Sequence, residues 1–134
     1  MARPKKVVDA SIGVKWFSQE EGSDAARELL RQHIEEEVVI VVPQLFLYEV
    51  VNALRYKKIN SDQLLRAIAD LADFQLQSEF PTKEVLQRSS VLALKHDLSI
   101  YDAMYLSVAE KTQSPCITSD KKFLGSKHVS IRAL

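Results

Sequence analysis

The segment Val38–Val42 restricts the possible fold more than any other part of the chain. It is an unbroken run of apolar, β-branched residues, and Pro43 follows it. β-branched side chains favour extended backbone, and a run without polar alternation suits a strand that is covered on both faces. A sheet that contains such a strand needs helices on each side, so this run indicates an α/β fold.

Strand-like and helical segments alternate along the rest of the chain. Strands are expected at 6–9, 74–80, 116–119 and 129–134, and helices at 23–37, 43–57, 61–73, 82–96, 99–111 and 121–124. Strands separated by helices imply crossover connections and a mainly parallel sheet. The sequence therefore predicts a three-layer α/β/α fold around a mainly parallel central sheet of four to five strands. No repeat or linker divides the 134 residues, so we expect one domain over 1–134.

The charges are balanced, with 18 Lys and Arg against 18 Asp and Glu. A net charge of zero excludes the broad basic field of a protein that coats nucleic acid, so any polyanion has to be held locally. The single cysteine excludes an internal disulfide and a multi-cysteine zinc site, and it suits a reducing compartment. No run approaches the roughly 20 apolar residues of a membrane span. We therefore expect a cytoplasmic protein that makes no membrane contact.

Four acids stand at positions where the expected topology can bring them together. Asp9 and Asp120 each follow an expected strand, and ligands bind at the carboxyl edge of open parallel sheets. Asp102 falls in the first turn of an expected helix, which should face the same edge. Glu49 is the only charged residue in 38–54, so much of the surface around it is apolar.

Each of these acids also has a structural explanation. An acid in the turn after a strand, as at Asp9, is common. Ser99 and Asp102 match a capping box, and Asp120 can cap the short helix that follows it. Glu49 can lie on one exposed face of its helix, which would spare it the cost of burial.

Taken together, the acids point to a metal. At about 4 to 5 Å, like charges repel by a few kcal/mol at an effective dielectric near 20, which raises the pKa of each acid unless a cation neutralises them. Oxygen ligands without a histidine among them favour Mg²⁺ or Mn²⁺. The sequence thus predicts a Mg²⁺ or Mn²⁺ site formed by Asp9, Glu49, Asp102 and Asp120.

Four segments around these acids resemble the PIN-domain family, in the family's order and over nearly the whole chain. They are 7–17 with Asp9, 43–54 with Glu49, 98–110 with Asp102 and 117–123 with Asp120. The Tyr-Asp-Ala helix start, followed about eighteen residues later by Thr-x-Asp, is the most specific of these signatures. More narrowly, the chain is similar to the VapC-like ribonuclease toxins of toxin–antitoxin systems.

This resemblance implies a PIN-like fold and a metal-dependent endoribonuclease that leaves a 5′-phosphate and a 3′-hydroxyl. The four acids would be its catalytic residues and metal ligands, with Asp9 and Asp102 in direct contact with the metal. The resemblance also implies three supporting residues around them, Ser11, Asn52 and Thr118. It further implies a homodimer and a small antitoxin protein that covers the site.

Basic residues near these segments can hold the phosphates that flank the cleaved bond. The candidates are Lys15, Arg55 and Lys121, followed by Lys57, Lys58 and Lys122. Exposed lysines are common on soluble proteins, so a solvated surface is the alternative for each.

Other reactive or aromatic residues are expected to have structural roles. Cys116 lies within an expected strand, where nothing nearby supplies a base, and should be a core residue. Trp16 and Phe17 are expected in the core as well. The histidines show no ligand spacing and are expected at the surface: His33, His96 and His128.

Two other functions remain open at this point. A phosphoacceptor signalling domain also gathers acids at a sheet edge, but it needs two adjacent acids after its first strand. Here Asp9 is followed by Ala10 and Ser11, which disfavours that class. A catalytically inactive PIN-fold module that acts through dimerisation or partner binding has the same sequence features, and failure to bind Mn²⁺ would favour it.

Overall fold

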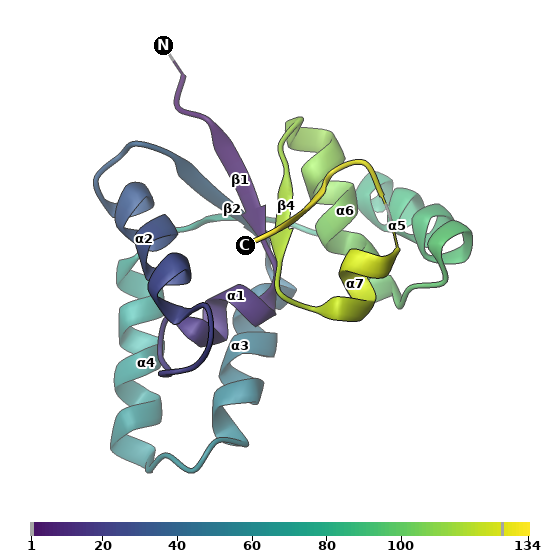
Figure 1. Ribbon diagram of the computed structural model, residues 1–134. Helices are drawn as coiled ribbons and strands as arrows, with labels where there is room; N and C mark the ends of the chain where they lie inside the picture. Colours follow the sequence, from purple (N-terminus) through teal and green to yellow (C-terminus); the bar gives the residue numbers. More distant parts are fainter. Residues whose placement is uncertain (1, 127) are drawn as a thin grey trace.

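The computed structural model describes residues 2–126 and 128–134 and contains a five-stranded sheet (Figure 1). Its strands are β1 (Lys5–Val8), β2 (Val39–Pro43), β3 (Gln77–Glu79), β4 (Cys116–Thr118) and β5 (Ile131–Ala133). They lie in the order β3-β2-β1-β4-β5, and all neighbours are parallel. The order reverses between β1 and β4, and open α/β sheets bind ligands at such a switch point.

Helices flank the sheet on both sides, as Figure 1 shows, with α1 to α4 on one side and α5 and α6 on the other. The bounds are α1 (Ala10–Lys15), α2 (Ser23–Ile34), α3 (Leu45–Arg55), α4 (Ser61–Asp73), α5 (Lys83–His96), α6 (Ile100–Thr112) and α7 (Lys121–Gly125). The predicted α/β/α fold with a parallel sheet is therefore confirmed. None of the helices in the described ranges has both the length and the hydropathy that a membrane crossing requires.

The centre of the core is the pair of strands β1 and β2. Val7 lies beside Val41 in the parallel register, and both are fully buried. Ile40 and Val42 are fully buried too, so successive residues of β2 are covered on opposite faces of the sheet. This confirms that the apolar run around β2 is a strand packed between two helical layers.

Gly13 allows α1 and α3 to approach closely. A Cβ atom at this position would lie 2.6 Å from Phe46 Cζ and 2.7 Å from Val50 Cγ2, well inside van der Waals contact. Because Phe46 and Val50 are themselves fully buried, the close-packed core leaves them little room to move. The close contact holds the carboxyl end of β1 against the turn of α3 that carries Glu49.

The helix α1 was not expected from the sequence, because six residues carry too little periodicity to reveal it. Asp9 forms its N-cap, and the buried residues Ile12 and Val14 turn toward the core. The expected helix 23–37 ends earlier, at Ile34, and Glu36 has a positive φ of 63°. A non-glycine residue in that region marks the end of the helix.

The expected strand 74–80 is wrong over most of its length, since only Gln77–Glu79 is extended. Phe74 instead closes α4, where its N–H donates to the Asp70 carbonyl (3.0 Å). Its ring packs edge-on against Trp16, with the ring centroids 5.8 Å apart. The alternating pattern of this segment therefore reflected tertiary packing of Phe74 rather than a strand.

The surface position expected for His33 is also wrong, because this residue is buried. Its Nδ1 accepts from Ile40 N (3.0 Å), and its Nε2 lies 2.8 Å from the Phe74 carbonyl, so the ring joins α2 to β2 and the end of α4. His96 and His128 are half-buried against each other. The expected burial of Trp16 and Cys116 is confirmed, and Phe17 packs against the core.

Candidate active site

Asp9 lies at the sheet's switch point and is buried. Its Oδ1 accepts from Ser11 N (3.1 Å) and Ser11 Oγ (2.5 Å), and its Oδ2 accepts from Thr118 Oγ1 (2.5 Å). A carboxylate offers about four lone-pair positions, so these three bonds leave about one, on Oδ2, within the described part of the chain. The charge is thus fixed in orientation and can still take one more partner.

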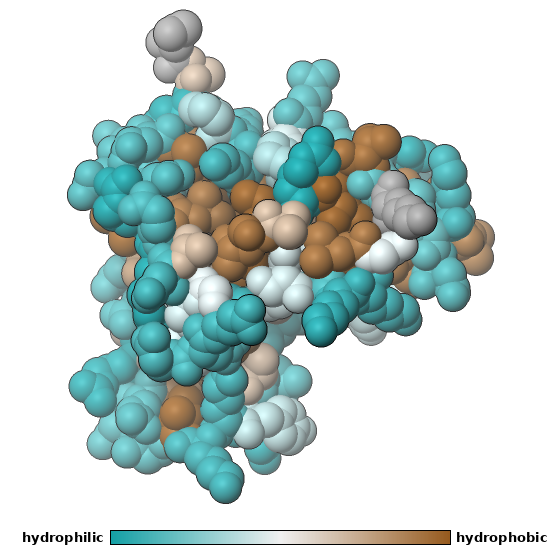
Figure 2. Space-filling model, viewed as in Figure 1, coloured by the Kyte–Doolittle hydropathy of each residue, from teal (hydrophilic) through white to brown (hydrophobic). Residues whose placement is uncertain are grey.

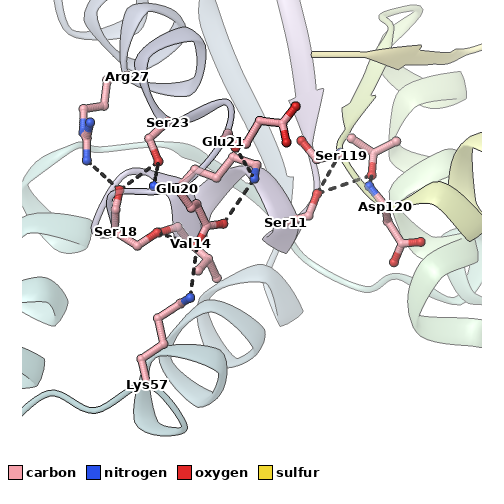
Figure 3. A network of polar contacts seen from close by, with 12 residues as sticks. Ser11, Val14, Ser18, Glu20, Glu21, Ser23, Arg27, Lys57, Ser119 and Asp120 are labelled. Atoms are coloured by element: carbon pink, nitrogen blue, oxygen red, sulfur yellow. Dashed lines mark hydrogen bonds and ion pairs between the residues drawn. The ribbon is translucent and has the colours of Figure 1, made fainter.

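The two hydroxyls that hold Asp9 are themselves oriented by the β4–α7 turn. Ser119 N donates to Ser11 Oγ (2.9 Å), and Asp120 N donates to Thr118 Oγ1 (2.9 Å). Figure 3 shows Ser11 facing Ser119, with Asp120 next to it. Because each hydroxyl accepts from a backbone N–H, its own hydrogen points at Asp9. Two short chains of hydrogen bonds thus connect Asp9, at the end of β1, to the β4–α7 turn.

Glu49 reaches the same edge from α3 and is half-buried. Tyr105 Oη, from α6 on the other side of the sheet, donates to Glu49 Oε1 (2.5 Å). Burial raises the pKa of Tyr105, and the negative charge of Glu49 raises it further, so the phenol stays a neutral donor. One hydrogen bond therefore ties the two helical layers together at the site.

Asp102 and Asp120 lie at the first turns of two helices. Ser99 Oγ accepts from Asp102 N (3.1 Å), as half of the expected capping box. Asp120 Oδ1 accepts from Lys122 N (2.9 Å) and Phe123 N (3.1 Å), which makes it the N-cap of α7. The structural explanations of these acids are thus correct, and they do not prevent a second role.

The acids of the four elements influence one another electrostatically. Burial raises the pKa of Asp9 more than the bonds from Ser11 and Thr118 lower it, and the charge of Asp120 raises it further. Burial likewise raises the pKa of Glu49, with added repulsion from Asp102 and Asp9. The structure therefore brings together charges that lie far apart in the sequence.

Asp102 completes this set. Burial raises its pKa and the charge of Asp120 adds to the effect, while Ser99 and Lys122 lower it only in part. Protons are held more tightly wherever negative charge lacks a positive partner. In residues 2–126 and 128–134, no Lys, Arg or His nitrogen lies within 4.0 Å of any of the four carboxylates.

A family model of the PIN domain matches residues 6–125. The chain belongs to the PIN-domain family. Ribonuclease VapC3 of Pyrobaculum aerophilum is 32% identical to it over 123 residues, which cover 88% of this chain and 91% of that protein. The recognised resemblance is therefore confirmed at the level of the family.

Solved structures agree on the PIN fold. The sarcin-ricin loop cleaving toxin VapC20 of Mycobacterium tuberculosis aligns with a TM-score of 0.73 at 18% identity, over 95% of this chain and 98% of that one. A toxin–antitoxin complex from Klebsiella pneumoniae gives 0.68 at 20% identity, over 95% of each chain. At such low identity the likeness concerns the fold, and the site has to be argued from its own residues.

The donor chemistry of this PIN-domain edge fits a hard divalent cation. All candidate donors are carboxylate oxygens, which suit Mg²⁺ or Mn²⁺. Asp9 in particular is a buried carboxylate that no basic side chain pairs with in the described ranges. Within those ranges, however, no three His, Cys, Asp or Glu side chains lie close enough together to hold a metal ion as they stand. The edge therefore offers the charge and the ligand type rather than a finished coordination shell.

The basic residues near the site are not equally available. Lys15 Nζ lies 3.1 Å from Glu20 Oε1 and donates to the Glu21 carbonyl (2.8 Å). Lys57 Nζ lies 3.1 Å from Glu20 Oε2, as Figure 3 shows, and one carboxylate therefore holds both lysines. Lys121 is exposed, and no ion pair engages it in the described residues. Lys121 is therefore the most available of these three lysines, and Lys122, also exposed, is near enough to Asp102 for its charge to lower the pKa of that acid.

Two further candidates on α3 lie less close to the chemistry. Asn52 is exposed, and no hydrogen bond in the described ranges connects it to the acids. Arg55 stacks over the Tyr56 ring, with its guanidinium carbon 4.8 Å from the ring centroid. It stands six residues after Glu49, or about 9 Å along the helix axis. Arg55 can therefore meet only a phosphate some distance from the acids.

Tyr105 is the functional candidate that the sequence did not reveal. It stands three residues after Asp102 and so lies on the same face of α6. That spacing is a usable signal, but a tyrosine in an apolar helix is more often a core residue. Only the tertiary contact with Glu49 shows that its hydroxyl belongs to the site.

Proposed function

We propose that this chain is a metal-dependent endoribonuclease, formed as a single catalytic domain over residues 1–134, and the toxin of a toxin–antitoxin pair. The observation that carries the proposal is the buried Asp9, which Ser11 and Thr118 hold, which Asp120 and Glu49 influence electrostatically, and which has no basic partner in the described ranges. Membership of the PIN-domain family and the likeness to Ribonuclease VapC3 support the same reaction class.

In this proposal Asp9, Glu49, Asp102 and Asp120 hold one or two Mg²⁺ or Mn²⁺ ions at the switch point. Bound there, a divalent cation supplies Lewis-acid chemistry at an RNA phosphodiester. Ser11 and Thr118 fix both oxygens of Asp9, and Tyr105 fixes Oε1 of Glu49, so the carboxylates keep their orientation when substrate arrives. Asn52 is a weaker candidate for such support because it is exposed.

The phosphates that flank the cleaved bond require positive charge beside the acids. Lys121 is the main candidate for this role, since it is exposed next to Asp120. Lys15 can contribute only by leaving Glu20, and Arg55 only at a distance. The neutral net charge of the chain is compatible with this arrangement, because the cation brings its charge to the phosphate.

We further propose that the chain acts in the cytoplasm, forms a homodimer and binds a small antitoxin that covers the acids. The toxin–antitoxin complex from Klebsiella pneumoniae, which has the same fold, supports this kind of partner. Exposed tyrosines near Glu49 and Asp102, namely Tyr48 (76% exposed) and Tyr101 (66% exposed), provide apolar area beside the site for either partner or substrate.

A cleavage assay with a matched variant tests the proposal. The purified chain is expected to cut single-stranded RNA in Mg²⁺ or Mn²⁺, to stop in EDTA, and to leave 5′-phosphate ends. Asp102→Asn keeps the size of the side chain and the Ser99 cap, which binds the Asp102 backbone N–H, yet it should abolish cleavage. Cleavage by Asp102→Asn at the wild-type rate, or cleavage that survives EDTA, would contradict it. Absence of both cleavage and Mn²⁺ binding would favour the inactive interaction module.

A further inference from the structure

A small cavity adjoins the acids on the side of α2 and α7. It has a volume of about 320 Å³ and lies between the α1–α2 turn, the β4–α7 turn and the end of β5. Its lining includes Ala25, Ser119, Lys121, Leu124 and Leu134. In Figure 1 the end marked C lies just above α1 and to the left of α7, and Figure 2 shows the same face with hydrophobic residues in its upper middle and hydrophilic residues around them.

The cavity and the acids share the β4–α7 turn. Thr118 lines the cavity and also donates to Asp9 Oδ2 (2.5 Å). Ser119 lines it as well, while its N–H holds Ser11 Oγ (2.9 Å). A group bound in the cavity is therefore separated from Asp9 by a single layer of side chains.

The lining has an apolar side and a charged side, and the charged side carries two lysines and the exposed acid Glu21. Leu124, Leu134 and Ala25 form apolar surface, whereas Lys121 brings a positive charge that no acid pairs with in the described ranges. Lys15 also lines the cavity, but its ammonium group is held by Glu20. This combination suits a ligand with one apolar face and one negative group.

Size and backbone geometry narrow the ligand further. The volume corresponds to roughly ten water molecules, which is the scale of a small-molecule site and too small for a helix or a duplex. Gly22 forms one wall of the cavity without a side chain. Its φ of +87° is unfavourable for other residues, and a Cβ there would lie 3.4 Å from Leu134 Cδ2. One unpaired nucleotide matches these dimensions.

We propose that this cavity binds the unpaired nucleotide next to the scissile phosphate, with its base against Leu124 and Leu134 and its phosphate at Lys121. This inference rests on the proposed ribonuclease activity, and it adds the path that the RNA strand takes away from the acids. Bases present an apolar face whatever their identity, so the subsite demands a single strand rather than a particular base.

Two variants test the subsite by steady-state cleavage of a short single-stranded RNA. Ala25→Trp fills the cavity from the exposed face of α2, and Lys121→Ala removes its cation. Each should raise KM about fivefold or more while kcat stays within about twofold of the wild-type value. The reason is that the bound substrate and the transition state lose the same interaction. The matched controls are Ala69→Trp, at an exposed alanine of α4 outside the cavity, and Lys5→Ala, at the opposite end of β1, and neither should change KM.

A nuclear magnetic resonance titration of the metal-free protein with adenosine 5′-monophosphate tests binding without catalysis. The amides of Ala25, Ser119 and Lys121 should shift more with the nucleotide than with inorganic phosphate, and Ala25→Trp should remove the difference. Unchanged KM in both variants, a fall in kcat alone, or equal shifts with phosphate would overturn the subsite while leaving the ribonuclease proposal intact. Absence of wild-type cleavage, with the nucleotide shifts present, would overturn the ribonuclease proposal alone.

Discussion

Glu20 and Asp9 are carboxylates near the two ends of α1, and their surroundings shift their pKa values in opposite directions. At Glu20, burial alone would raise the pKa, but hydrogen bonds from Lys57 and Lys15 outweigh it and lower the pKa to about 2. At Asp9, burial dominates over the bonds from two hydroxyls, and the pKa rises. The first acid holds two lysines, whereas the second is held by two hydroxyls and a backbone N–H, all uncharged.

The difference separates acids that hold the fold from acids that need an outside partner. Glu20 fastens the α1–α2 turn to the end of α3 and already has its opposite charges. The charges of Asp9, Glu49 and Asp102 repel, and in the described ranges no basic side chain pairs with them. A fold that retains such acids leaves a place for an external cation. The predictions below test this contrast.

The largest expected effect is on catalysis. Asp9→Asn keeps the shape of the side chain but removes the charge, so RNA cleavage in Mg²⁺ should fall about a thousandfold. Glu20→Gln removes an acid from the neighbouring turn and should change the cleavage rate less than about threefold. Rates of the two variants measured side by side check the contrast, and equal losses in both would break it.

A second expected effect concerns the orientation of Glu49. Tyr105→Phe removes the hydroxyl that donates to Glu49 Oε1 and leaves the ring in the core. Because groups behind a metal ligand typically contribute 10- to 100-fold, we expect a loss of about tenfold in kcat. The control is Tyr101→Phe, at an exposed tyrosine of the same helix, which should retain the wild-type kcat if orientation is the cause.

A third effect concerns thermal stability. A cation that binds only the folded chain stabilises it by about 2.7 kcal/mol at a concentration of 100 Kd, so saturating Mg²⁺ should raise Tm by several degrees. Asp9→Asn should lose this increase, and Glu20→Gln should keep it. Scanning calorimetry with Mg²⁺ and with EDTA measures both, and a similar increase in Asp9→Asn would place the cation elsewhere.

The smallest effect is the pH dependence at Glu20. Its folded pKa, about 2, lies below the ordinary value of 4.5, so its contribution to stability is complete above pH 4.5 and is lost as the pH falls toward 2. Since the pairs are partly exposed, each contributes less than about 1 kcal/mol. Urea unfolding of wild type and Glu20→Gln should therefore differ at pH 6, and the difference should shrink below pH 4.5 and disappear as the pH approaches 2. A difference that grows as the pH falls would have the wrong sign.

Much of the fold was readable from the sequence because local patterns agreed with tertiary structure. The β2 strand, the Ser99 cap and the acids at strand ends all follow from short-range rules. The strand order then brings Asp9 and Thr118 together, because both stand at the carboxyl edge of neighbouring strands.

The remaining features depend on contacts that no local pattern encodes. The pairing of Glu20 with Lys57 spans 37 positions, and the bond from Tyr105 to Glu49 spans 56. Nothing in the sequence around His33 indicates that its ring bonds the backbone of Ile40 and Phe74 in the core. Such contacts arise only when helices from separate crossovers are packed, which is also why the availability of Lys15 could not be inferred.

The account depends most directly on whether the coupled acids bind a divalent cation. Calorimetric titration of Mn²⁺ into wild type, Asp9→Asn and Glu20→Gln measures this without RNA. The account predicts binding to wild type and Glu20→Gln with similar affinity, and a loss of at least about tenfold in Asp9→Asn. Absence of binding to the wild type, or equal affinity in Asp9→Asn, would contradict it.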